Sequence, residues 1–221
     1  MPAAKKKIQK QTEIAIDLPQ MNRQTLILTL VGDSSLVMHR WSEKAKKMML
    51  DKQMKKAKQA KEAKDPQQDF AESIYIFDEK PGDREKVKNL DFKGIRFGFP
   101  AVAFKAAAVG ACRFADGVKM TEARGAFHVN LGEDLIEIEG TPKPREDMVR
   151  IAMGTADIRF RGEFKKWRAK IKVQYNASAM SAEQVTNLFN IAGFGVGVGE
   201  ARPEKNGSWG MFHVATSEDT K

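Results

Sequence analysis

The chain has 221 residues, which suffice for one large domain or a compact domain with an insertion. Its 38 Lys and Arg outnumber 29 Asp and Glu, so the formal net charge is +9. Such a charge favours nucleic acid or an anionic membrane surface, although a solvated basic protein is the alternative. The single cysteine, Cys112, excludes an intramolecular disulfide and a zinc site built from several cysteines.

The N-terminal half predicts one strand and one lysine-rich helix. Residues 1–20 are expected to form a loose basic arm, and residues 21–221 a single domain. The apolar run 25–31 predicts a buried first strand of the core sheet. A helix over 42–64, which Asp65-Pro66 is expected to end, carries many lysines and only a thin apolar stripe, so it packs weakly. Together with the loop-rich residues that follow it, this helix forms an expected insertion lobe over 42–98.

The C-terminal half alternates helices and strands. Pro100 begins a thin helix over 101–113, because proline is favourable at a helix start. The segment 114–153 is expected to contain a hairpin, formed by 127–130 and 135–139. Residues 141–147 are expected to form a loop.

Two more strands are predicted over 157–161 and 167–175. A capping box at Ser181 then starts a helix that ends at 192, with Gly193 as the residue that closes it. A glycine-rich stretch leads to a last strand over 210–215.

The strands over 157–175 predict a nucleic-acid contact. Cationic residues alternate with apolar ones on both strands, so each strand is expected to bury one face and expose a basic one. An anionic ligand would relieve the repulsion between neighbouring like charges, whereas a solvated face without a partner is the alternative. The cationic residues are Arg159, Arg161, Arg168, Lys170 and Lys172.

The glycine-rich stretch 193–210 predicts a second contact. A loop of alternating glycines can present successive N–H groups to phosphate, and here it also carries Arg202, Lys205 and Trp209. A helix precedes the glycines and a strand follows them, which excludes a dinucleotide-binding fingerprint. A flexible turn is the alternative. Lys52 and Lys55 on the lysine helix are further candidates, and the scarcity of bulky apolar residues there disfavours a membrane.

Catalytic candidates are few. The three histidines are far apart in sequence, and each is expected to be structural rather than a metal ligand. Asp33 follows the first strand, where functional loops often lie, so it is a candidate for RNA cleavage or metal binding, although we expect it to cap a turn. We expect a protein that is not an enzyme and needs no cofactor or metal. No apolar segment has the length of a bilayer span and no secretory signal is present, so we expect the cytoplasm.

The order of the predicted elements resembles that of the RAMP superfamily, and two segments of the sequence carry the same resemblance. Within the superfamily, the chain is most similar to the backbone subunits of CRISPR effector complexes. The segments are FPAVAFKAAAVGACR (99–113) and the helix 181–192 with the glycine-rich loop after it. The resemblance implies an α+β fold with a ferredoxin-like or RRM-like βαββαβ core. It implies that Lys105 and Arg113 face the guide backbone, and that Arg202 and Lys205 occupy the basic positions of the loop.

The leading hypothesis is therefore a non-catalytic subunit that binds single-stranded guide RNA and polymerises along it as a homo-oligomer or filament, with other effector subunits as further candidate partners. A phage-type protein that binds or anneals single-stranded DNA fits nearly as well. A RAMP-type endoribonuclease and a structural protein of a virus or assembly are the remaining alternatives. Binding through counterion release would be strongly salt-dependent in the first two cases.

Overall fold

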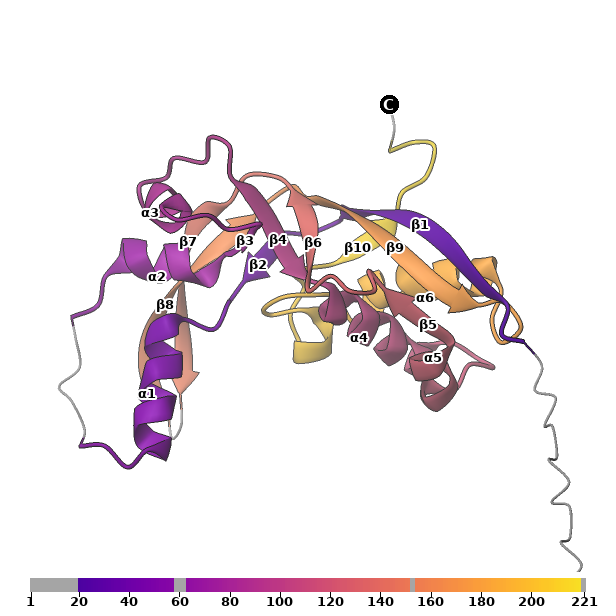
Figure 1. The fold of residues 1–221 in the computed structure, drawn as a ribbon, viewed down its shortest axis with the longest axis horizontal. Coiled ribbons are helices and arrows are strands. Elements are labelled where there is room, and N and C mark those ends of the chain that lie inside the picture. Colours follow the sequence, from indigo (N-terminus) through magenta and orange to yellow (C-terminus); the bar gives the residue numbers. More distant parts are fainter. Residues whose placement is uncertain (1–19, 58–62, 152–153, 220–221) are drawn as a thin grey trace, which may run out of the picture.

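The computed structural model describes residues 20–57, 63–151 and 154–219, and shows a mixed α+β fold (Figure 1). The expected basic arm lies outside the described residues apart from residue 20. Two antiparallel sheets form the fold. Among the residues described, no helix has both the length and the apolarity that a membrane span requires.

The larger sheet contains a ferredoxin-like core, which confirms the predicted fold class. Its βαββαβ elements are β1 (Arg23–Gly32), α4 (Ala101–Ala111), the short strands β5 (Phe127–Val129) and β6 (Leu135–Glu139), β9 (Arg168–Asn176), α6 (Ala182–Gly195) and β10 (Phe212–Val214). The strands lie in the order β10-β1-β9-β6, and β5 also pairs with β9. The fourth strand of the motif therefore lies beside the first, and the third lies between the first and the second.

The helices α4 and α6 pack on one face of this sheet and leave the other face open (Figure 1). Phe104 of α4 is fully buried, and its ring centroid lies 5.9 Å from that of Phe99 and 6.0 Å from that of Phe212. Leu28 and Leu30 of β1 are buried, whereas Ile27, which precedes Leu28 and faces the other side of the sheet, is 59% exposed. The first strand is therefore half-buried rather than buried, because only its even-numbered residues face the helices.

The segment between β1 and α4 contributes to both sheets. It contains β2 (Leu36–Met38), α1 (Glu43–Gln53), α2 (Pro66–Ser73), β3 (Tyr75–Phe77), α3 (Asp83–Lys88) and β4 (Arg96–Pro100). β4 pairs with β6 and β3 pairs with β4, so these two strands extend the core sheet. The second sheet has the order β2-β8-β7, with β7 (Lys143–Ile151) and β8 (Thr155–Phe164) forming a long ribbon.

Several local predictions are wrong at the level of helix ends. α1 begins at its predicted cap, Ser42, but ends at Gln53. The Asp65-Pro66 pair starts a helix rather than ending one, because the Asp65 side chain caps α2. Two helices were not predicted from the sequence: α3, and α5 (Met120–Ala126) within the segment 114–153. The capping box at Ser181 is confirmed, but α6 continues past Gly193 to Gly195.

Two strand predictions also fail because of pairings that are distant in sequence. Residues 127–129 pair with β9 and not with 135–139, so the expected hairpin does not form. Residues 143–147, expected in a loop, pair with 159–163 as part of the β7–β8 ribbon. Pro142 precedes β7 and Pro144 is its second residue. β7 is an edge strand, where a missing N–H is tolerated.

Candidate nucleic-acid interface

β9 presents a row of cations on the open face of the core sheet. Arg168, Lys170 and Lys172 are exposed, and the alternating residues Ala169 and Ile171 are buried against the helices. The predicted alternation on this strand is confirmed. Within the described part of the chain, the Nζ atoms of Lys170 and Lys172 form no hydrogen bond or ion pair. We call these three residues the β9 row.

A hollow of about 330 Å³ lies beside the β9 row on the same face. Ile27 of β1 lies directly opposite Lys172, and Thr29 lies opposite Lys170. Phe77 of the terminal strand β3 forms another wall of the hollow. Cations therefore lie beside an apolar and an aromatic side chain, which is the combination that holds the phosphates and the bases of a single strand.

Acidic side chains border the row on the side of β6, so the open face is not uniformly basic as expected. Glu133, Glu137 and Glu139 line the same hollow. Arg96 of β4 donates to both carboxylate oxygens of Glu137, at 2.7 and 2.6 Å, and to Asp78 at 3.0 Å. The hydrogen bonds from Arg96 lower the pKa of Glu137, and the positive charge of Arg96 compensates the negative charge of this carboxylate. The cations thus lie along β9, and the acidic side chains lie along and just before the neighbouring strand β6.

One end of the β9 row contacts the C-terminal segment. The Arg168 guanidinium donates to the Asp219 carbonyl at 2.7 Å. His213 of β10 lies with Nδ1 2.6 Å from Asp33 and Nε2 3.3 Å from the Asp219 carboxylate. Burial lowers the pKa of His213, but hydrogen bonds to Asp33 and Asp219 outweigh it and raise the pKa above its usual value.

Sequence reasoning missed this His213–Asp33 pair, because 180 residues separate its members and only the pairing of β1 with β10 brings them together. Asp33, the candidate for RNA cleavage, is thus engaged in an ion pair. In the described ranges, no group of three or more His, Cys, Asp or Glu side chains could hold a metal ion.

The prediction of a basic face on β8 is wrong. Arg161 is 8% exposed and pairs with Asp147 at 3.3 Å and with Glu200 at 3.4 Å. Arg159 pairs with Asp157 at 2.7 Å. Ile158, predicted to face the core, is 44% exposed. Arg161 is buried because β7 and the glycine-rich loop place the carboxylates of Asp147 and Glu200 on the side of β8 that carries the arginines.

The glycine-rich loop does not present its N–H groups to solvent. The N–H groups of Gly197, Val198 and Glu200 donate to the carbonyls of Ala192, Gly210 and Val37, respectively. The glycines are required by close packing: a Cβ at Gly193 would lie 1.6 Å from the Phe212 carbonyl oxygen. The loop is therefore a folded connection and not the phosphate cradle that was expected.

The cations and the tryptophan of this loop are mostly engaged within the protein. Arg202 pairs with Glu204 at 2.8 Å, and Arg113, in the 3-10 turn that follows α4, pairs with the same carboxylate at 2.9 Å. The structure thus brings together two residues that the family resemblance assigned to guide binding. The Trp209 ring lies 3.7 Å from the guanidinium carbon of Arg145. Lys205 is exposed.

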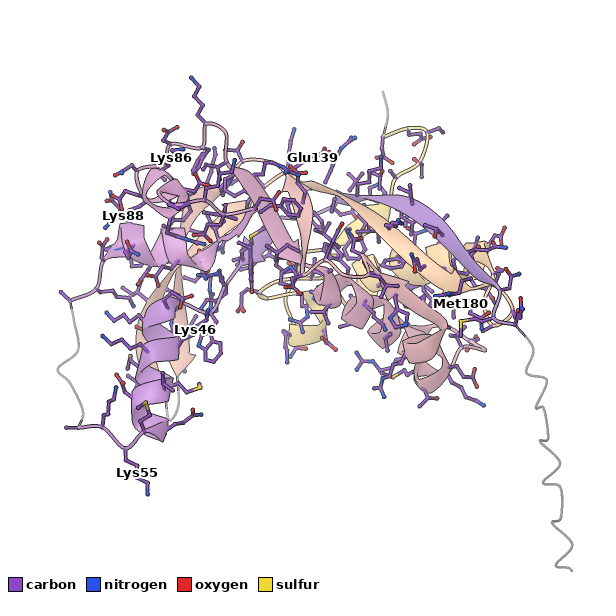
Figure 2. All side chains as sticks on the ribbon, viewed as in Figure 1. Lys46, Lys55, Lys86, Lys88, Glu139 and Met180 are labelled. Atoms are coloured by element: carbon purple, nitrogen blue, oxygen red, sulfur yellow. The ribbon has the colours of Figure 1, made fainter. Side chains whose placement is uncertain are left out.

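The remaining candidates lie apart from one another. Lys105 on α4 is 3.1 Å from His128 Nδ1, and its burial lowers the pKa of its ammonium group. Lys52 and Lys55 are exposed on and just after α1, a helix without a buried side chain. Figure 2 shows Lys46 and Lys55 at one end of the molecule, far from Glu139 beside the β9 row. The predicted residues therefore form no single site.

Comparisons with known proteins find similarity among solved structures alone. No family model and no curated protein matches the chain. Among solved structures, the crystal structure of Cmr6 from Pyrococcus furiosus is similar with a TM-score of 0.37 and 10% sequence identity, covering 89% of this chain and 100% of that one. The assignment of the fold rests on the strand order described above and not on this likeness.

Proposed function

We propose that the chain binds the sugar-phosphate backbone of single-stranded nucleic acid, with RNA as the strand, and that it is not an enzyme. The observation that carries this proposal is the β9 row, in which Lys170 and Lys172 are exposed beside Ile27 and Phe77 and have no partner among the residues that the structure describes. Cations that already have carboxylate partners, such as Arg161 and Arg202, would have to exchange them for phosphate.

The driving force on this face is the release of counterions from the bound strand. Each phosphate neutralised by a lysine frees condensed cations, and binding of this kind depends little on sequence. Phe77 and Ile27 add apolar contact for the bases, which every base can use. The lysine-rich α1 offers a second set of cations at the other end of the molecule. Because α1 is distant from the β9 row, its lysines would contact another part of the same nucleic-acid strand.

The finer proposal is a subunit that polymerises along a guide RNA in a CRISPR effector. It is supported by the resemblance of 99–113 and of the glycine-rich loop to the RAMP superfamily, and by the meeting of Arg113 and Arg202 at Glu204. A protein that binds or anneals single-stranded DNA is the second candidate, because the lysines of the β9 row contact phosphate and do not read the 2′-hydroxyl.

Binding to single-stranded RNA and DNA of one sequence and length, measured at several salt concentrations, tests the proposal. If about four phosphates are contacted, affinity falls roughly 50-fold between about 50 and 200 mM salt. Tighter binding of RNA supports the guide-RNA proposal, and tighter binding of DNA supports the second candidate. An affinity that does not change with salt contradicts both.

The proposed absence of catalysis has its own test. Labelled RNA is incubated with the wild type and with Asp33→Ala, because general acid–base cleavage needs a group within hydrogen-bond reach of the scissile position. We expect intact RNA in both samples. Cleavage by the wild type that the variant lacks would make the Asp33–His213 pair a catalytic site.

A further inference from the structure

A second cavity, of about 320 Å³, lies under the start of α4, between this helix and the glycine-rich loop. Its apolar lining includes Phe99, Ala103 and Val196, from β4, α4 and the residue after α6. Phe99 and Val196 are buried, and Ala103 is partly buried. The volume is at the lower end of the range of small-ligand sites, so the cavity accommodates one ring system.

Tyr75 gives the cavity an aromatic wall. Its ring lies edge-on to Phe99, with centroids 5.9 Å apart and an interplanar angle of 79°. Tyr75 is partly exposed, and burial raises the pKa of its hydroxyl, so the ring stays neutral. A partly exposed neutral aromatic ring over an apolar floor is a surface on which a flat ring can stack.

Polar groups lie around the same cavity. The His39 imidazole Nδ1 is 3.6 Å from the Glu200 carboxylate, and the Arg202 guanidinium donates to the Gly199 carbonyl at 3.1 Å. Imidazole and guanidinium N–H groups donate hydrogen bonds, and the carboxylate accepts them. A ligand that fits this cavity therefore has flat apolar faces and an edge with both donors and acceptors. A nucleobase has both properties.

The terminal strand of the sheet, β3, contributes a lining residue to this cavity and another to the hollow on the proposed strand-binding face. Tyr75 and Phe77 are alternate residues of β3: the first lines this cavity, and the second lines the hollow beside the β9 row. Alternate residues of a strand lie about 6.6 Å apart on one side of it. A strand that follows this edge can reach both places.

We propose that this cavity binds one nucleobase, unstacked from the single strand that the open face holds. The inference rests on the proposed function and adds to it a place where a base, rather than a phosphate, is bound. The occupant is a base of the strand, and a free nucleotide, which shares its chemistry, is distinguished in the test below.

The test compares a homopolymeric RNA with an abasic sugar-phosphate strand of equal length, on the wild type and on Ala103→Leu, which fills the cavity. The matched control is Val102→Leu, because Val102 is the adjacent residue of α4, is 70% exposed and does not line the cavity. Thermal unfolding of the three proteins shows that each is folded. Uridine monophosphate is added as a competitor in a separate arm.

We expect the wild type and Val102→Leu to bind the strand with bases about tenfold more tightly than the abasic strand. A difference of this size is one that a single stacked base can supply. Ala103→Leu should lose the part of this difference that the cavity supplies, retain the smaller part that Phe77 and Ile27 supply, and keep its affinity for the abasic strand. Equal affinities in the wild type, or a difference that is as large in Ala103→Leu as in Val102→Leu, would overturn the inference while the proposed function stands. Tight binding of the mononucleotide without a preference between the strands would also overturn it. Failure to bind either strand would refute the proposed function itself.

Discussion

β8 and β9 carry the same alternation of cationic and apolar residues, and the fold uses the two strands differently. On β9 the cations face solvent across an open sheet, whereas on β8 Arg161 is buried between Asp147 and Glu200. The glycine-rich loop, which supplies Glu200, resembles β8 in this respect, because its glycines and Arg202 also make contacts within the protein. An alternating pattern specifies two faces, and the elements packed on each face decide which is exposed.

This comparison predicts that substitutions in the β8 region reduce stability, and that substitutions in the β9 row reduce binding. The largest effect is expected for Arg161→Ala, which leaves Asp147 and Glu200 without their buried partner. The free energy of unfolding should fall by about 3 kcal/mol in urea denaturation. Arg159→Ala is the control on the same strand: its side chain is 36% exposed, so removal of its single ion pair should cost below about 1 kcal/mol. Equal losses would contradict the assignment of Arg161 as the buried member.

The next effect concerns the glycines. Gly193→Ala forces a methyl group against the Phe212 carbonyl oxygen, 1.6 Å from the ideal Cβ position, and should lower the free energy of unfolding by about 2 kcal/mol. Gly125→Ala, in α5 with open space around the added methyl group, should raise it by about 0.5 kcal/mol. Chemical denaturation measures both. If Gly193→Ala left the free energy of unfolding unchanged, α6 would be shown to tolerate separation from β10.

In the β9 row, Lys170→Gln with Lys172→Gln should weaken binding of single-stranded RNA about tenfold and reduce the slope of log affinity against log salt by about 1.4. Stability should change by less than about 0.5 kcal/mol, because both side chains are exposed and unpaired among the described residues. The charge-matched control is Lys93→Gln with Lys119→Gln, two exposed lysines outside the β9 row. An equal loss in the control would mean that net charge, and not the row, is responsible.

The smallest effect is the pH dependence of the His213–Asp33 contact. The pKa of His213 is raised in the folded state, so its contribution to stability is full below the usual value near 6.5 and is lost as pH rises through the folded value. Asp33→Asn should therefore destabilise the protein more at pH 6 than at pH 8, by less than about 1 kcal/mol for these partly exposed groups. Thermal unfolding at both pH values measures this. A greater loss at pH 8 would contradict the direction of the shift.

Sequence reasoning recovered the features that depend on neighbouring residues. The alternation of β9, the capping box at Ser181 and the start of α4 after Pro100 are local, and all three are confirmed. The ferredoxin-like core was predicted through the resemblance to the RAMP superfamily, which rests on the order of these elements and on two segments, and the strand order confirms it.

The errors concern contacts between residues that are distant along the chain. Arg161 could not be placed from β8 alone, because one of its carboxylate partners lies in the glycine-rich loop. The pairing of 127–129 with β9 instead of 135–139 likewise depends on a strand that comes later. Asp65-Pro66 is an ambiguous signal, since the same pair can end one helix or cap the next, as it does here.

Lysine acetylation in the presence and absence of single-stranded RNA, read at each lysine by mass spectrometry, tests the central claim most directly. Our account predicts that the strand protects Lys170 and Lys172 from modification, while Lys93 and Lys119 react equally in both samples. Protection of the α1 lysines without protection of Lys170 and Lys172, or no protection at any lysine, would contradict the assignment of the open sheet face as the binding surface.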